Sequence, residues 1–259
     1  MNWKLDFIKQ EDYKEHVRAF FREVVECSTA NNIIEFNKNI IDPIKMTFSY
    51  FATGEDKTGI INSEVTRQQD KTINNSIGYF HQNIFQYIEG WEVPRAGFDI
   101  INQEKHIFVE LKNKHNTMNS ASSQKTYINM QSKILDDDEA ICLLVEVIAK
   151  KSQDIPWAIK VNGENKKHKN IRRVSLDKFY ELVTGDPNAF KKIVEWLPIT
   201  LKDLVVEEHI VQSDNLIIEQ LEEDGSFFEG LYKLAFRDYL GFNDLAFVGI
   251  EKLGEEFSK

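Results

Sequence analysis

The chain is poor in cysteine, contains no long apolar run and has no excess of positive charge. Two cysteines, Cys27 and Cys142, occur among 259 residues, and they lie too far apart for metal-site spacing. We interpret both as buried thiols in a reducing compartment. No stretch approaches the roughly 18 apolar residues that a membrane span needs, and the N-terminus lacks the apolar stretch of a secretory signal. We therefore expect a cytoplasmic protein with no membrane partner.

The net charge of -10 argues at first against a nucleic-acid partner. The acidic residues are unevenly distributed, however. After Thr200 there are 14 acidic and 5 basic residues, which leaves 28 acidic and 27 basic residues in the first 200. A nuclease also needs carboxylates locally to hold metal, so the overall charge does not exclude DNA as a substrate.

The hydrophobic pattern indicates three parts with no clear domain boundary between them. Residues 1–90 are mostly of helical periodicity, residues about 91–175 mix strand-like and helical patterns, and helices resume over about 175–259. Within the first part we expect a helical stretch from about Asn31 that Pro43 interrupts, then a loop, then an apolar helical stripe. That loop and that stripe cover residues 48–60 and 72–88. We predict one α/β domain over residues 1–259, with a mixed central sheet flanked by helices.

The central part contains the segment GFDIINQEKHIFVELKNK, residues 97–114. We expect two strands here, over 97–101 and 105–112, joined by a short turn. Glu110 and Lys112 are two positions apart, so both side chains leave the same face of the second strand. The turn can bring Asp99 opposite Glu110. Two carboxylates that meet there form a hard oxygen site suited to Mg²⁺, and their mutual repulsion makes a cation necessary.

A lysine beside a metal site has a use in phosphodiester hydrolysis. The reaction needs an activated water and stabilisation of the charge that develops on the phosphate. Lys112 can orient the water and add positive charge beside the phosphate. The simpler interpretation is a surface hairpin with a cross-strand Glu–Lys pair, because this spacing is common by chance. The helix expected over 122–134 and the apolar strand expected over 140–149 favour the catalytic interpretation.

These three residues resemble the motif of the PD-(D/E)XK nuclease superfamily, which includes most type II restriction endonucleases. A proline often precedes the aspartate in that motif, and Phe98 replaces it here. The resemblance implies a restriction-endonuclease-like core, metal binding by Asp99 and Glu110, and assistance to the attacking water by Lys112. Related nucleases often carry a further acid on a preceding helix. Gln82 stands in that region, so we regard it as a site residue, with a solvated helix face as the alternative.

The segment that follows the ExK motif has almost no carboxylates. It is rich in amide, hydroxyl and basic side chains, which suit phosphate oxygens and base edges. A polar loop with a helix N-cap is the simpler interpretation. We expect these residues to contact DNA: Asn113, Lys114, His115, Asn116, Thr117, Asn119, Ser120, Ser122 and Ser123.

The stretch ELKNKHNTMNSASSQKTY, residues 110–127, is similar to a narrower family of type II restriction endonucleases that recognise the palindrome GGNCC. The resemblance extends less specifically over much of the chain. It implies double-stranded DNA as the substrate, Mg²⁺ as the cofactor, products with 5′-phosphates, and a homodimer whose two-fold axis matches the palindrome. A restriction–modification role would also require a companion DNA methyltransferase.

Two further features have open interpretations. A basic cluster that includes Lys166, Lys167 and Lys169 follows the strand expected over 157–161, on what we predict is a loop. It could bind the DNA backbone or be a solvated surface. Glu146, an isolated acid in an apolar strand, either faces the active site near Lys112 or pairs with a structural cation.

Three functions are compatible with these observations. The first is a sequence-specific endonuclease, the second is a repair or recombination nuclease with the same catalytic residues, and the third is a non-catalytic DNA-binding module. The intact set of Asp99, Glu110 and Lys112 favours an enzyme, since a binding module does not need all three.

Overall fold

The computed structural model describes residues 3–28, 52–53, 57–115, 117–208, 236 and 238–246. The chain divides into two compact units, Met1–Val17 with His81–Lys259, and Arg18–Phe80. The expectation of one domain stays a prediction. Among the described helices, none combines the length and the apolar character that a membrane crossing requires.

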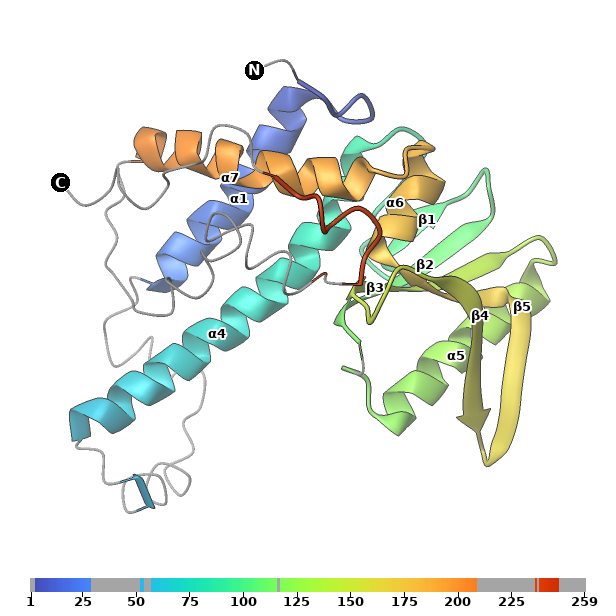
Figure 1. Cartoon of the computed structure of the whole chain (residues 1–259). Coiled ribbons are helices and arrows are strands. Elements are labelled where there is room, and N and C mark those ends of the chain that lie inside the picture. Colours follow the sequence, from blue (N-terminus) through green and yellow to red (C-terminus); the bar gives the residue numbers. More distant parts are fainter. Residues whose placement is uncertain are drawn as a thin grey trace. The chain divides into compact units, whose positions relative to one another are not determined.

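The larger unit contains a five-stranded mixed sheet (Figure 1), as predicted. The strands are β1 (Ile100–Asn102), β2 (Ile107–Lys114), β3 (Ile141–Ile148), β4 (Asp154–Val161) and β5 (Glu164–Ser175), in the spatial order β1-β2-β3-β5-β4. The central strands β2, β3 and β5 are mutually parallel, and the edge strands β1 and β4 are antiparallel to their neighbours. The carboxyl ends of the three central strands therefore meet at one edge of the sheet.

Helix α5 (Ser120–Asp136) follows β2 directly and returns the chain to the start of β3. Its buried residues Tyr127 and Met130 pack against one face of the sheet, in a core that contains Phe108, Cys142 and Ile171. This βαβ connection places the N-terminus of α5 near the carboxyl end of β2.

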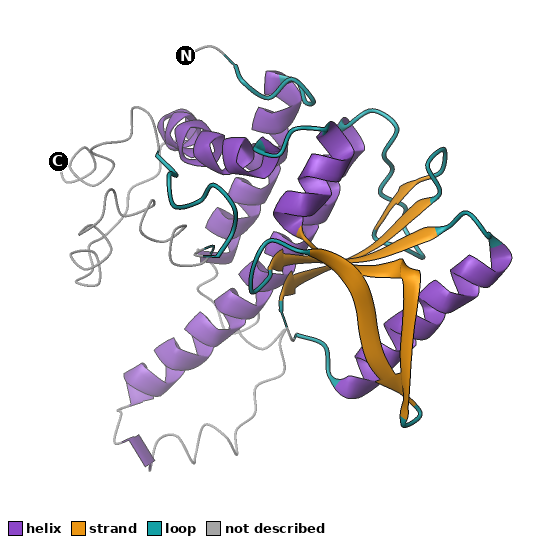
Figure 2. Cartoon of the chain, turned by 45° about the vertical axis from the view of Figure 1, so that its right-hand side comes forward, coloured by secondary structure: helices purple, strands orange, loops and turns teal. Residues whose placement is uncertain are grey.

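Helix α6 (Leu176–Thr184) covers the opposite face (Figures 1 and 2). Its rings Phe179 and Tyr180 each lie 4.9 Å from the Phe85 ring, which belongs to the short helix η1 (Ile84–Tyr87). Both faces of β3 are thus covered, which explains why ICLLVEVI is almost entirely apolar. The one charged side chain in that strand, Glu146, must therefore be compensated inside the protein.

Two further helical segments complete the larger unit beside the sheet. Helix α7 (Ala189–Glu208) contacts the first part of α1 (Gln10–Ser28), where the Tyr13 hydroxyl donates to the carbonyl of Ile193 at 2.9 Å. Near these helices, the Trp3 ring lies 4.9 Å from that of Trp196. These contacts fit the helical N-terminal and C-terminal parts that we predicted.

The smaller unit contains most of helix α4 (Lys57–Asn83). The helix therefore begins within the segment that we expected to be a loop, well before the apolar stripe at 72–88. The stripe itself continues from α4 into η1. The stretch predicted around Asn31 and Pro43 lies outside the described residues.

Strand β5 is the largest difference from the prediction. We expected a loop that carries the basic cluster, but Lys166, Lys167 and Lys169 lie on this strand. Asn162 and Gly163 connect β4 to β5 with φ angles of 50° and 84°, which match the tight hairpin turn that Asn-Gly pairs favour. The density of charged residues in 164–173 led us to expect a loop, although the segment is a strand whose two faces have different environments.

Candidate active site

Asp99, Glu110 and Lys112 come together where β1 and β2 pair. The Asp99 amide, just before β1, donates to the carbonyl of Val109 at 2.9 Å, and Val109 is also the residue that pairs with Ile100. The Asp99 carboxylate oxygen Oδ2 accepts from the Leu111 amide at 2.7 Å. The backbone of β2 therefore fixes the aspartate beside the glutamate. The turn itself lies slightly later than predicted, at residues 103–106.

The amine of Lys112 lies between the two carboxylates. Its Nζ is 3.3 Å from Glu110 Oε2 and 3.8 Å from Asp99 Oδ2, and it donates to the Leu111 carbonyl at 3.1 Å. The three side chains are partly exposed, at 28% for Asp99, 18% for Glu110 and 30% for Lys112. They are thus close together and still accessible from solvent.

The two carboxylates are close enough to influence each other's charge. Burial raises the pKa of the Glu110 carboxyl, and the nearby Asp99 charge raises it further, whereas Lys112 opposes both effects. Two carboxylates held together in this way repel each other unless positive charge lies between them. Carboxylate oxygens are also the ligands that Mg²⁺ prefers. Asp99 and Glu110 could hold a divalent cation.

Gln82 lies beside this pair at the end of α4. Its Nε2 donates to the backbone carbonyl of Asp99 at 3.1 Å and so reaches the aspartate's main chain. Within the described residues, no group of three or more histidine, cysteine or acidic side chains gathers as a metal site. The described part of the site therefore offers two carboxylates and one neighbouring amide.

The segment after β2 forms the connection to α5. Asn119 is the N-cap of that helix, and its Oδ1 accepts from the Ser122 amide at 2.8 Å. Ser120 and Ser123 line a cavity together with Lys112, whereas Ser122 is exposed and does not line it. Thr117 donates to the carbonyl of Lys114 at 3.0 Å. Asn113 is half-buried at the end of β2, and Asn116 lies outside the described residues.

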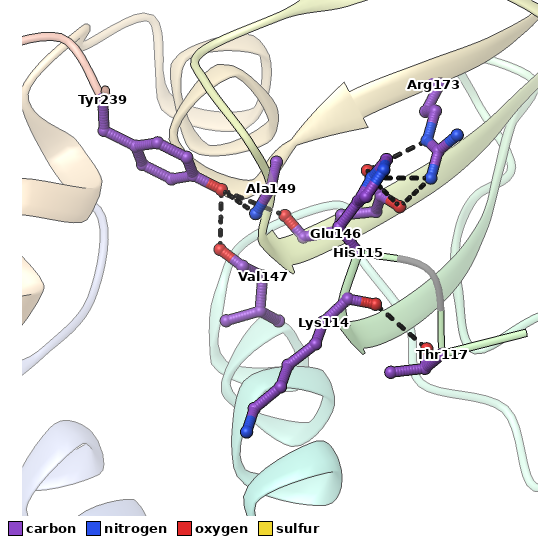
Figure 3. Close-up of polar contacts among 8 residues, drawn as sticks. All are labelled: Lys114, His115, Thr117, Glu146, Val147, Ala149, Arg173 and Tyr239. Atoms are coloured by element: carbon purple, nitrogen blue, oxygen red, sulfur yellow. Dashed lines mark hydrogen bonds and ion pairs between the residues drawn. The ribbon is translucent and has the colours of Figure 1, made fainter. Parts of the chain in front are cut away.

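His115 is held in a network that the sequence did not reveal. Its Nδ1 lies 3.1 Å from both carboxylate oxygens of Glu146 and 2.8 Å from Nη2 of Arg173 (Figure 3). Arg173 binds the same carboxylate through Nε, at 2.9 Å, and through Nη2. Glu146 faces Lys112 directly across the β2–β3 pairing. Glu146 therefore pairs with a cation, as one interpretation had it, and its register also places it beside Lys112.

The basic residues of β5 lie in different surroundings, because neighbouring side chains of a strand face opposite sides of the sheet. Arg173 pairs with Leu144 on the α5 side of the sheet, whereas Arg172 points to the other side and binds Asp154 at 2.6 Å. Lys167 and Lys169 are exposed, and Lys166 forms an ion pair with Glu164. Alternation holds only over the last part of β5, where Ile171, buried in the α5-side core, lies two residues before Arg173; earlier in the strand the register with β4 shifts, so period two along the whole of 164–175 would not have identified Arg173.

The sequence of the chain is similar to those of known restriction endonucleases. Residues 5–206 match the family model described as Eco47II restriction endonuclease. The chain is 30% identical to the type II restriction enzyme Sau96I of Staphylococcus aureus, over 83% of this chain and 86% of the relative. It is 29% identical to the type II restriction enzyme Eco47II of Escherichia coli, over 78% of this chain and 89% of the relative.

Proposed function

The chain belongs to the Eco47II restriction endonuclease family, and from this premise we propose that it cuts both strands of duplex DNA with Mg²⁺ held by Asp99 and Glu110. As a type II restriction enzyme it is a site-specific deoxyribonuclease. The observation that carries the proposal is the position of the Lys112 amine, 3.3 Å from one carboxylate and 3.8 Å from the other.

The donor set fits a divalent cation. Both groups are carboxylates, and both are partly open to solvent. The pKa of Glu110 is raised by burial and by repulsion from Asp99, and a bound cation would relieve the repulsion. When bound, Mg²⁺ supplies Lewis-acid stabilisation of the phosphate and lowers the pKa of the attacking water. Asp99 and Glu110 are the residues that would hold it.

The chain's own residues then position the reactants. The Leu111 amide holds the Asp99 carboxylate in place, and Gln82 holds the Asp99 main chain. With a cation between the carboxylates, the Lys112 amine is no longer needed to balance their charge. It is then available to donate a hydrogen bond to the attacking water and to place a positive charge beside the phosphate.

We further propose that the recognition site is the palindrome GGNCC and that the products carry 5′-phosphates. The resemblance of residues 110–127 to enzymes with that specificity supports the site. A homodimer would place one active site on each strand of the palindrome. The described residues among 113–123 lie at the end of β2, in the connection that follows it and in the first turn of α5, close to Lys112 in the chain, which supports their role in DNA contact. A cytoplasmic location and a companion methyltransferase belong to the same proposal.

Digestion of a plasmid of known sequence tests this function. We expect discrete fragments in Mg²⁺, ends that map to GGNCC, and no cutting when EDTA removes the cation. End-labelling by polynucleotide kinase only after phosphatase treatment would identify 5′-phosphates. Discrete ends at an unrelated sequence would refute the proposed specificity. Cutting that persists in EDTA would refute the metal site.

A further inference from the structure

A cavity of about 300 Å³ adjoins the active site on the α5 side of the sheet. Lys112 lies at its border with the catalytic residues, and neither Asp99 nor Glu110 is among the described residues that line it. The residues that bear on its chemistry are Lys112, Ser120, Ser123, Trp157, Lys160 and Arg173. The cavity is therefore a neighbouring space, separate from the pair of carboxylates.

The charge of this cavity favours an anion. Four basic residues line it, Lys112, Lys114, Lys160 and Arg173, against the single carboxylate of Glu146. The first turn of α5 contributes Ser120 and Ser123, and it contains no acidic residue. The amino end of this helix adds partial positive charge to the same space. In Figure 3 the Lys114 amine points away from the Glu146–Arg173 pair, so Arg173 is the better-placed cation.

Arg173 is fixed in one orientation by its neighbours. Its Nε and Nη2 bind Glu146, whose side chain is 2% exposed, and Nη2 also lies 2.8 Å from His115 Nδ1. Among the described residues, none accepts a hydrogen bond from Nη1, so its two N–H groups remain available. A guanidinium held in this way loses little conformational entropy when it binds an anion.

The position of the cavity relative to Lys112 indicates which anion it takes. Lys112 faces Glu146 on the neighbouring strand, and Arg173 lies on the strand beyond it, on the same face. Backbones of strands separated by one strand are roughly 10 Å apart, and the side chains extend over that interval. A DNA strand whose scissile phosphate is at Lys112 can therefore present its next phosphate to Arg173.

We propose that this cavity is a second phosphate subsite, which binds the DNA phosphate adjacent to the scissile one on the same strand. Arg173 donates to its non-bridging oxygens through Nη1, and Glu146 and His115 act as positioning residues that hold the guanidinium. The inference rests on the proposed function, because it takes the scissile phosphate to lie at Lys112. The subsite would fix the register of the strand over the catalytic residues.

Neutral phosphates in the substrate test the subsite directly. Duplexes carry one methylphosphonate at successive positions around the cut, and binding is measured in Ca²⁺. With the wild-type enzyme we expect neutralisation of the adjacent phosphate to weaken binding about tenfold to hundredfold, as for other hydrogen bonds to charged groups. The double variant Glu146→Gln, Arg173→Met should bind unmodified DNA more weakly by a similar factor. It should be insensitive to neutralisation at that position.

Two further variants keep the test independent of folding. Arg173→Lys leaves a cation against Glu146 but lacks Nη1, so it should remain folded and lose most of the sensitivity. Arg172→Gln is the matched control, because Arg172 faces Asp154 and does not line the cavity, and it should respond as the wild type does. Log affinity falls linearly with log salt concentration. For Arg173→Lys and for the double variant this negative slope should become shallower by about 0.9, as expected for the loss of one phosphate contact.

The two proposals fail in different ways. A wild-type enzyme that does not cut DNA in Mg²⁺ would overturn the proposed function. A wild-type enzyme that cuts, together with folded Arg173 variants that remain as sensitive as wild type to every neutralised phosphate, would overturn only the subsite.

Discussion

The buried ion pair between Glu146 and Arg173 leads to a quantitative prediction about stability. The Glu146 carboxylate lies in the central strand β3, and although it borders the cavity its side chain is only 2% exposed, so little solvent is available to compensate its charge when a partner is removed. Removing one member of a buried ion pair costs about 3–5 kcal/mol, because the remaining charge is left uncompensated. For Arg173→Met we expect a value of about 3 kcal/mol, since His115 Nδ1 remains 3.1 Å from both Glu146 oxygens.

The double variant Glu146→Gln, Arg173→Met should be more stable than Arg173→Met alone. It leaves no buried charge, so we expect its free energy of unfolding to lie within about 1–2 kcal/mol of the wild-type value. The assay is urea denaturation without metal, followed by circular dichroism. The slope of the free energy of unfolding against urea concentration should be the same for all variants. The idea of a buried, mutually compensating pair would be refuted if the double variant were less stable than Arg173→Met. A coupling energy between Glu146 and Arg173 below about 0.5 kcal/mol would also refute it.

Three other predictions follow from single side chains. Lys112→Ala should lower the single-turnover cleavage rate about 10²–10³-fold while DNA binding in Ca²⁺ persists, and an unchanged rate would contradict its catalytic role. Burial raises the pKa of the Cys142 thiol to about 12, so in a Cys27→Ser background iodoacetamide at pH 8 should label Cys142 only after denaturation; rapid labelling of the folded protein would contradict this. The hydrogen bond that the His106 ring donates to the Asp137 carboxylate raises the pKa of His106. This ion pair therefore stabilises the fold below the ordinary histidine pKa, and the stabilisation is lost as pH rises through the raised value. His106→Asn should reduce stability more at pH 6 than at pH 9, and equal losses would contradict it.

The parts of the fold that could be predicted from sequence are those with a strong local pattern. The apolar strand β3, the amphipathic helix α5 and the pairing of β1 with β2 all follow from periodicity. The contacts of Asp99 with Lys112 and Leu111 depend only on strand geometry and a short turn, so the residues could be grouped without a structure. The choice among the three functions was also resolved in favour of the first, since the chain is a type II restriction enzyme.

Strand β5 and the Arg173 network could not be predicted from the patterns that we used. The dense charges of residues 164–173 indicated a solvated loop, although the Asn162-Gly163 pair is a hairpin signal. Arg173 acquires its role only because β3 lies between β2 and β5, which brings Glu146 next to it. Such a contact depends on the order of strands in the sheet, and local sequence does not encode that order.

The proposed cleavage mechanism requires the two carboxylates as metal ligands, and isosteric removal of their charge tests this requirement most directly. Asp99→Asn keeps an oxygen that can accept from the Leu111 amide, and Glu110→Gln keeps the volume of the side chain, so both variants should remain folded. The measurement is the single-turnover cleavage rate at saturating Mg²⁺, with Glu104→Gln, exposed in the β1–β2 turn, as the control. We predict that both active-site variants lose cleavage by a factor of at least about 10³ while the control cuts normally. Folded Asp99→Asn and Glu110→Gln proteins that cut DNA at the wild-type rate would contradict it.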